Sequence, residues 1–215
     1  MASILITAGP TREYLDDVRF LSNGSSGRMG CALAEAALAD GHETYLVLGP
    51  IERQPPAGAR VRSVTSALEM QAAAEEWFER CQVAIAAAAV ADWRPAHRLP
   101  GKPRRGALER LELVPNPDIV AGLGARKGAR VVVGFALESA AASWPQTIER
   151  GREKLAQKHL DLVVCNRTDA IASDGSAAVL LFADGRQVEI GRQDKLATAQ
   201  TIVRAAVQLH ERRAS

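Results

Sequence analysis

Cysteine is scarce in this chain, and none of its cysteines is placed for metal chemistry. Cys31, Cys81 and Cys165 are far apart, lie in apolar stretches, and form neither a CxxC pair nor the spacing of metal ligands. They are predicted to be reduced core thiols of a cytosolic protein. The four histidines likewise form no triad and no ligand spacing, which argues against metal-hydrolase and serine-hydrolase chemistry.

Excess charge of one sign and long apolar runs are also lacking. The formal net charge is only +2 over 215 residues, so there is no electrostatic footprint for nucleic acid or an anionic membrane. No apolar run approaches the ~20 residues of a membrane span, and a predicted strand begins too early for the charged region of a signal peptide. We therefore expect a cytoplasmic protein that binds neither nucleic acid nor membranes.

What the chain does have is length for one well-buried domain and a regular alternation of element types. Its strand-like segments are apolar throughout and alternate with helix-like ones, which is typical of a parallel sheet covered on both faces. We predict a single α/β domain over residues 1–215, a Rossmann-like, mostly parallel sheet with helices on both faces and an appended C-terminal β-hairpin. The predicted strands are Ser3–Ala8, Glu43–Leu48, Val83–Ala89, Arg130–Ala136, Leu160–Cys165, Ala177–Phe182 and Gln187–Ile190. The predicted helices are Arg28–Asp40, Ala67–Arg80, a short helix after Pro117, Thr147–Gln157 and Asp194–Arg213.

A long polar loop follows the first predicted strand. An ordinary βα turn takes about 2–6 residues, whereas here a Gly- and Ser-rich stretch runs from Gly9 to Gly27 before the first helical pattern. Backbone N–H groups before a helix suit a phosphate or a developing oxyanion, and Arg12, Arg19 and Asn23 can add side-chain donors. The alternative is a solvated surface loop with an N-cap serine.

A run of small residues at Ala86–Ala89 leads to Asp92, at the carboxyl end of a central predicted strand. Small residues let a ligand approach the backbone, and ligands of parallel sheets bind at this edge. A carboxylate there can hold a ribose hydroxyl, a base amino group or a metal-bound water. The alternative is an N-cap or turn aspartate.

Basic residues come from separate segments. The stretch Pro95–Ala107 is rich in proline, glycine and positive charge, and it is predicted to be a mobile basic loop over a site that contains Lys102. Lys154 and Lys158 are four apart on a predicted helix and share one face. Converging on one point, the three lysines would neutralise a triphosphate. Taken singly, each has the alternative of a solvated surface charge.

Two further segments have a functional and a structural interpretation. In Asn116-Pro117-Asp118-Ile119, Pro117 and the residues after it are typical of a helix start, so Asn116 or Asp118 can be caps. Phe135, near the end of a strand, offers an aromatic face to a base or belongs to the core.

Taken in this order, the segments resemble the phosphopantothenoylcysteine synthetase family, also called phosphopantothenate–cysteine ligases. The resemblance covers essentially the whole chain, and an ordered set of motifs is more specific than any one of them. The residues that carry it are Thr7–Glu13, Arg19–Asn23, Ser25–Gly27, Ala89–Asp92, Lys102, Asn116–Val120, Gly134–Ala136 and Leu160–Leu162.

The resemblance implies an enzyme of coenzyme A biosynthesis that ligates 4′-phosphopantothenate to L-cysteine, using a nucleoside triphosphate and Mg²⁺. In the family, the carboxylate attacks the α-phosphorus to give an acyl-nucleotide and pyrophosphate, and the cysteine amine then displaces the nucleotide. The family is dimeric, with the hairpin region contributing to association. In many bacteria the domain follows a flavin-dependent decarboxylase domain. This chain starts directly at the synthetase strand, so we expect a stand-alone synthetase, with a separate decarboxylase protein as a candidate partner.

The resemblance also implies roles for individual residues. Asn23 would stabilise the acyl-nucleotide, and Lys102 would serve the nucleotidyl transfer and contact nucleotide phosphate. The implied nucleotide-binding positions are Ala86, Ala87, Ala88, Asp92, Lys102, Pro117, Asp118, Ile119, Val120, Phe135, Lys154 and Lys158. The predicted substrate-binding positions are Gly9, Arg19, Asn23, Ser25, Ser26 and Gly27. Ligands for the metal are not implied.

Three departures from the family pattern concern the loops. Gly24 stands where many bacterial members have histidine, the lysine-rich loop is reduced to Lys102-Pro103-Arg104-Arg105, and Arg167 replaces the usual acidic residue after Asn166. Bacterial-type members use CTP and eukaryotic-type members use ATP. The bacterial-like motifs favour CTP here, through an acyl-cytidylate intermediate and with CMP as a product.

Two other classes of protein are alternatives for this sequence. An NAD(P)-dependent oxidoreductase on the same kind of sheet predicts a tight glycine fingerprint after the first strand, which is absent, and an acidic residue after the second, where this chain has Gly49-Pro50. A catalytically silent nucleotide-binding module stays open, because binding residues can persist without turnover.

Overall fold

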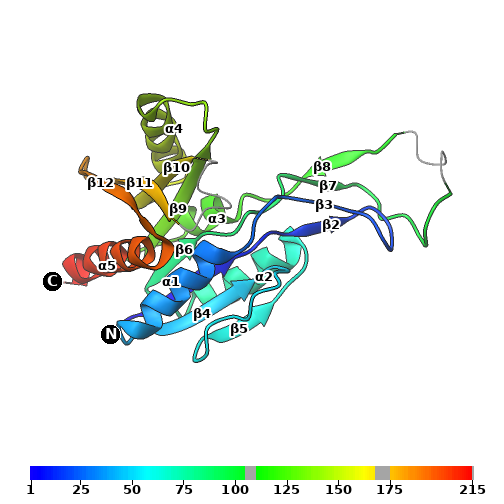
Figure 1. Cartoon of the computed structure of the whole chain (residues 1–215). Coiled ribbons are helices and arrows are strands. Elements are labelled where there is room, and N and C mark those ends of the chain that lie inside the picture. Colours follow the sequence, from blue (N-terminus) through cyan, green and yellow to red (C-terminus); the bar gives the residue numbers. More distant parts are fainter. Residues whose placement is uncertain (105–109, 168–174, 215) are drawn as a thin grey trace.

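The computed structural model describes residues 1–104, 110–167 and 175–214 (Figure 1). One eight-stranded sheet forms its centre. The strands are β1 (Ser3–Ala8), β4 (Glu43–Leu48), β5 (Arg60–Ser63), β6 (Val83–Ala86), β9 (Val131–Glu138), β10 (Leu162–Arg167), β11 (Gly175–Phe182) and β12 (Gln187–Asp194). Their order is β12-β11-β10-β9-β6-β1-β4-β5, parallel from β5 to β10, with β11 and β12 as an antiparallel hairpin at one edge. The predicted fold class and its appended hairpin are confirmed.

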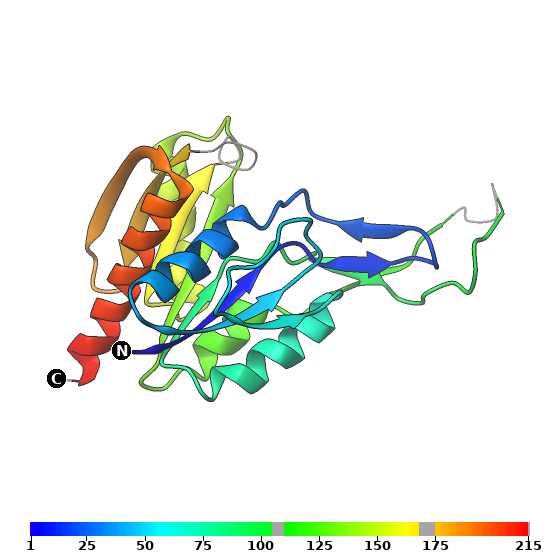
Figure 2. The same ribbon diagram turned by 60° about the horizontal axis from the view of Figure 1, so that its bottom comes forward.

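Helices cover both faces of this sheet. One face carries α1 (Arg28–Ala39) and α5 (Lys195–Ala214), and the other carries α2 (Ala67–Phe78), α3 (Ile119–Ala125) and α4 (Trp144–Gln157) (Figure 2). Among the described helices, none combines the length and the apolar composition needed to cross a bilayer.

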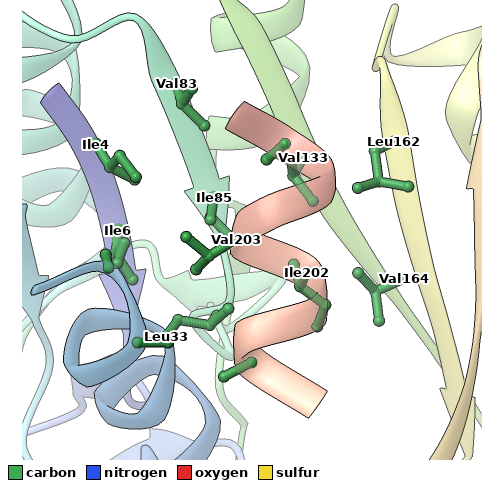
Figure 3. Close-up of a cluster of buried hydrophobic side chains, with 14 of the residues drawn as sticks. Ile4, Ile6, Leu33, Val83, Ile85, Val133, Leu162, Val164, Ile202 and Val203 are labelled. Carbon is green, nitrogen blue, oxygen red and sulfur yellow. The ribbon is translucent and has the colours of Figure 1, made fainter. Parts of the chain in front are cut away.

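The core under α1 and α5 explains why the strands lack alternation. Ile4 and Ile6 of β1 point toward this face together with Ile85 of β6, and they pack against Leu33 and Ile202 of the two helices (Figure 3). The intervening strand residues fill a second cluster on the α2 side. Because both faces are buried, the central strands β1, β4, β6 and β9 are mostly apolar on both faces, as the sequence predicted.

The three cysteines confirm the prediction of core thiols. All are free and buried. Burial raises the pKa of Cys81 and of Cys165 to about 12, so these thiols stay protonated and unreactive near neutral pH.

The principal differences from the sequence prediction lie in the long loops. The stretch predicted as an irregular polar loop contains a hairpin of β2 (Arg12–Tyr14) and β3 (Phe20–Ser22). The stretch predicted as a basic loop borders a second hairpin of β7 (Trp93–Pro95) and β8 (Leu113–Pro115). Residues 105–107 of that prediction lie outside the described residues.

The two hairpins lie side by side and form an arm that projects from the sheet (Figures 1 and 2). Near the β2–β3 turn, Asp17 N donates to Gly101 O at 3.1 Å and Leu99 N donates to Leu15 O at 2.7 Å. Arg98 also pairs with Asp17 at 2.9 Å. These contacts order residues 98–101 against the first hairpin, so this part of the predicted mobile loop belongs to the arm.

A buried carboxylate joins the C-terminal helix to the sheet. Asp161 is 2% exposed; its Oδ1 lies 2.5 Å from Lys127 Nζ and 2.5 Å from Arg213, and its Oδ2 accepts from Val132 N at 2.8 Å. We expect Asp161→Ala to lower the free energy of unfolding by about 3 kcal/mol, because two cations and a buried N–H lose their partner.

Urea denaturation with an unchanged slope is the measurement for Asp161→Ala. Arg204→Ala is the matched control, because Arg204 also ties α5 to another element but does so through the more exposed Asp40. We expect its effect to stay below about 1 kcal/mol. Equal losses in the two variants would contradict a special role for the Asp161 cluster.

Candidate functional site

The strand order reverses between β1 and β6. At this point hydrogen bonds join the start of the long loop to the stretch that follows β6. Gly9 O accepts from Ala89 N at 2.9 Å, and Thr11 Oγ1 accepts from Ala91 N at 3.0 Å. The stretch after β6 therefore leaves the sheet at Ala86, earlier than the predicted end at Ala89, and runs beside the start of the long loop. In doubly wound sheets this reversal point is where ligands bind.

Asn23 lies at this junction. Its Nδ2 donates to Val90 O at 2.9 Å and to Ala89 O at 3.3 Å, and the residue as a whole is exposed. The amide thus ties the β2–β3 hairpin to the stretch that follows β6. The position suits the role predicted for Asn23, which itself stays a prediction.

A hollow of about 690 Å³ opens beside Asn23. This volume is in the range of small-molecule sites. Predicted substrate positions Ser25 and Ser26 are in its wall. Its lining residues are Pro10, Arg12, Phe20, Ser22, Asn23, Gly24, Ser25, Ser26, Arg28, Pro50, Ile51, Glu52 and Arg53.

Sequence reasoning missed the wall formed by Arg28 and residues 50–53. The signal was available, because residues 50–53 follow β4, which pairs in parallel with β1 and so ends at the same sheet edge. Arg28 is the first residue of α1, directly after the Gly/Ser-rich stretch.

Gly9 and Gly27 serve the loop through their backbone conformation. Both have positive φ, +77° and +70°, and a Cβ at Gly27 would lie 2.8 Å from the Ile51 side chain. At Gly9 the same contact would be 3.0 Å. These glycines bring the loop against Ile51; neither is among the residues that line the hollow, and their predicted substrate contacts are not tested.

Arg19 does not reach the hollow of its own chain. It lies in the β2–β3 turn on the arm, where Arg19 NH2 is 2.5 Å from Asp16 Oδ2. The N–H of Arg19 also donates to Asp16 Oδ1, and such hydrogen bonds lower the pKa of Asp16 to about 2. The turn thus satisfies Arg19 locally, which the sequence pattern did not reveal.

Asp92 and the segment around Asn116 meet at the root of the second hairpin. Asn116 N donates to Asp92 O at 2.8 Å, and Asn116 Nδ2 donates to Ala91 O at 2.8 Å. Arg94 in turn donates to Asn116 Oδ1 at 3.2 Å. Asp92 is exposed beside these hydrogen bonds, and Pro117 and Asp118 follow Asn116 in the chain.

Asp118 and Lys158 have structural partners. Asp118 caps α3 by accepting from Ala121 N at 3.0 Å, and its other oxygen pairs with Lys158 at 2.7 Å. The cap interpretation of Asp118 is confirmed. Ile119 is buried and Val120 is partly buried against the core under α2, so both predicted positions belong to the packing of α3.

Phe135 lies beside the small residues after β6. Its neighbour Gly134 is the register partner of Ala86, and Phe135 itself is half-buried against the α1 and α5 face. Ala86, Ala87 and Ala88 are also half-buried. The predicted positions Ala86–Ala88 and Phe135 are therefore brought together.

The three predicted lysines come from two separate segments, and their convergence on one point stays a prediction. Lys102 directly follows Gly101, whose carbonyl oxygen is bonded to the β2–β3 turn on the arm. Lys154 lies in the last turn of α4, and Lys158 is the C-cap of this helix, where it pairs with Asp118 at 2.7 Å. Residues 98–101, just before Lys102, are held along the first hairpin.

No protein cage for a metal is present in the described residues. They contain no group of three or more His, Cys, Asp or Glu side chains placed to hold an ion. Two of the predicted site residues at this edge are acidic, Asp92 and Asp118. Asp118 is paired with Lys158, whereas Asp92 is exposed and makes no ion pair with the described residues.

Comparisons with known proteins agree with this architecture. The family model for the DNA/pantothenate metabolism flavoprotein C-terminal domain matches residues 1–209. The Escherichia coli protein "Coenzyme A biosynthesis bifunctional protein CoaBC" is 42% identical over 195 residues, covering 86% of this chain and 47% of that protein. The chain spans about half the length of the curated relatives it matches.

Solved structures extend the agreement to three dimensions. The C-terminal domain of a CoaBC protein superposes with a TM-score of 0.82 at 33% identity, covering 97% of this chain and 95% of that one. A Cab2 mutant in complex with phosphopantothenate-cysteine superposes with a TM-score of 0.77, covering 98% of this chain and 87% of that one. At 17% identity, the second likeness concerns the fold alone.

Proposed function

The chain belongs to the family of the DNA/pantothenate metabolism flavoprotein C-terminal domain, and we propose from this premise that it ligates 4′-phosphopantothenate to L-cysteine in coenzyme A biosynthesis. The observation that carries the proposal is the placement of Asn23 at the reversal point between β1 and β6, beside a hollow of substrate size. A decarboxylase is the proposed partner, because the relatives are described as bifunctional proteins of coenzyme A biosynthesis.

The proposed reaction has two displacement steps. The substrate carboxylate attacks the α-phosphorus of CTP, the bond to pyrophosphate breaks, and an acyl-cytidylate forms. The cysteine amine then attacks the acyl carbon, loses a proton, and CMP leaves. We propose that Asn23 donates to the acyl-nucleotide in exchange for its longer bond, the one to Ala89 O at 3.3 Å. Donors fixed where charge develops are the largest catalytic contribution in many enzymes.

Magnesium would supply charge neutralisation on the triphosphate. The described residues offer no cage, and Mg²⁺ commonly binds through substrate phosphates, waters and one or two carboxylates. Asp92 is the carboxylate at this edge that would fit such a role. Nucleotide would occupy the edge of β6 and β9, near Ala86–Ala88 and Phe135.

A homodimer would bring Lys102 of one copy to the nucleotide site of the other. Lys102 follows Gly101, which is bonded to the projecting arm (Figure 1), so we propose that this lysine enters the nucleotide site of a second copy. The exposed large apolar residues on the arm support association: Val18, Phe20, Trp93 and Leu113 are 39–55% exposed. Side chains of this kind, left in solvent on a projecting arm, are typical of a protein interface.

We expect ligation with CTP to exceed ligation with ATP. The test is pyrophosphate release with phosphopantothenate, L-cysteine and each of the four common nucleoside triphosphates in turn. Activity with ATP equal to that with CTP would remove the nucleotide preference. If none of the triphosphates released pyrophosphate, the silent nucleotide-binding module would be the better description.

A further inference from the structure

Arg53 stands between two hollows. It lines the hollow beside Asn23 and a second one of about 350 Å³ that also contains Cys31 and Glu35 of α1. The Arg53 guanidinium therefore lies along α1, at the end of the larger hollow that is built by the loop after β4. Neither sequence motif nor family resemblance singled out this residue.

The sheet order separates the two ends of the larger hollow. The predicted nucleotide positions Ala86–Ala88 and Phe135 belong to β6, the stretch after it and β9, whereas residues 50–53 follow β4, on the other side of β1. Neighbouring strands lie about 4.8 Å apart, so β4 is roughly 10 Å from β6. A substrate whose carboxylate reacts at Asn23 must extend its other end toward this β4 loop.

Two arginines, Arg28 and Arg53, line the β4 end of the hollow. Arg28 and Cys31 are three residues apart on α1 and share a face, so Arg28 lies on the side where Arg53 borders Cys31. Arg12 also lines the hollow, where its guanidinium stacks over the Phe20 ring, 4.7 Å from the ring centroid. Glu52 is the one carboxylate in the wall.

Arg53 is available to a ligand. In the described part of the chain, no carboxylate oxygen lies within ion-pair distance of its guanidinium, in contrast to Arg19, which is held by Asp16. Guanidinium groups bind phosphate through paired hydrogen bonds, which makes them selective for planar or forked anionic oxygens.

From these observations we infer that Arg53 binds a phosphomonoester at the end of the hollow remote from Asn23. The inference rests on the proposed function, under which this phosphomonoester is the terminal phosphate of phosphopantothenate. Arg53 then sets the preference for the phosphorylated substrate over free pantothenate. The triphosphate of the nucleotide has related chemistry, and the test separates the two sources.

Arg53→Gln is the test variant, with Arg192→Gln on the exposed edge strand β12 as the matched control. We expect Arg53→Gln to raise KM for phosphopantothenate about tenfold or more while leaving KM for CTP within about twofold. Calorimetric titration with phosphopantothenate and with pantothenate should show a loss of affinity for the first compound only. Arg192→Gln should change none of these quantities.

Three other outcomes would overturn the inference, and a fourth would separate it from the proposed ligation. A rise in KM for CTP alone would assign Arg53 to the triphosphate. Equal losses for phosphopantothenate and pantothenate, or no loss for either, would leave no phosphate contact. If the wild-type protein bound phosphopantothenate and lost it in Arg53→Gln but released no pyrophosphate, the inference would hold and the proposed ligation would fail. Absence of phosphopantothenate binding in both assays would refute the inference.

Discussion

The Asn23→Asp protein is expected to bind nucleotide nearly as well as the wild type and to accumulate no acyl-nucleotide. The substitution keeps the size of the side chain but removes both N–H donors. Nδ2 of Asn23 now donates to two carbonyl oxygens, Val90 O at 2.9 Å and Ala89 O at 3.3 Å. A carboxylate there would face these oxygens and, during the reaction, the negatively charged acyl-phosphate.

Rapid-quench detection of the acyl-nucleotide, together with nucleotide affinity and thermal stability, measures this expectation. Asn116→Asp is the matched control, because Asn116 Nδ2 makes the same kind of bond, at 2.8 Å, to the adjacent Ala91 O. It removes a donor to the same stretch without touching the predicted reaction centre, so the intermediate should still form. Normal ligation by a folded Asn23→Asp protein would reduce Asn23 to a residue of a solvated turn.

Buried strands were predictable because their burial leaves a continuous apolar run. β1 and β4 were predicted with the bounds that the structure has. β5 was missed, since at the edge of the sheet its residues Arg60–Ser63 are largely polar and exposed. The arm hairpins were missed for a related reason: three-residue strands show no usable alternation, and they are fixed by contacts between the two hairpins.

The candidate site was predictable where its residues come from one loop. Asn23, Ser25 and Ser26 were predicted and lie around one hollow. Arg53 was missed because the β4 loop reaches the hollow only through the parallel pairing of β1 and β4. Roles for the predicted residues, the metal, the nucleotide and the stand-alone organisation stay predictions.

Lys102→Ala is expected to slow acyl-nucleotide formation roughly 100-fold or more, the scale on which a lost charge-stabilising group acts. Single-turnover pyrophosphate release is the measurement. Arg104→Ala is the control, because Arg104 is an exposed cation in the same segment. Unchanged release by Lys102→Ala would make this lysine a surface charge.

Co-expression of two inactive variants tests which copy supplies Lys102. If Lys102 enters the site of the other subunit, a heterodimer of Lys102→Ala and Asn23→Asp chains has one site with both residues intact and one site with neither. Purified through two different tags, it should recover about half of the wild-type activity, as expected for one working site of two. If Lys102 served the site of its own chain, each site would lack one residue and the heterodimer would stay inactive. Recovery would therefore identify the arm as the element that brings Lys102 to a neighbouring subunit, whereas an inactive heterodimer would require the arm to fold back onto its own sheet edge.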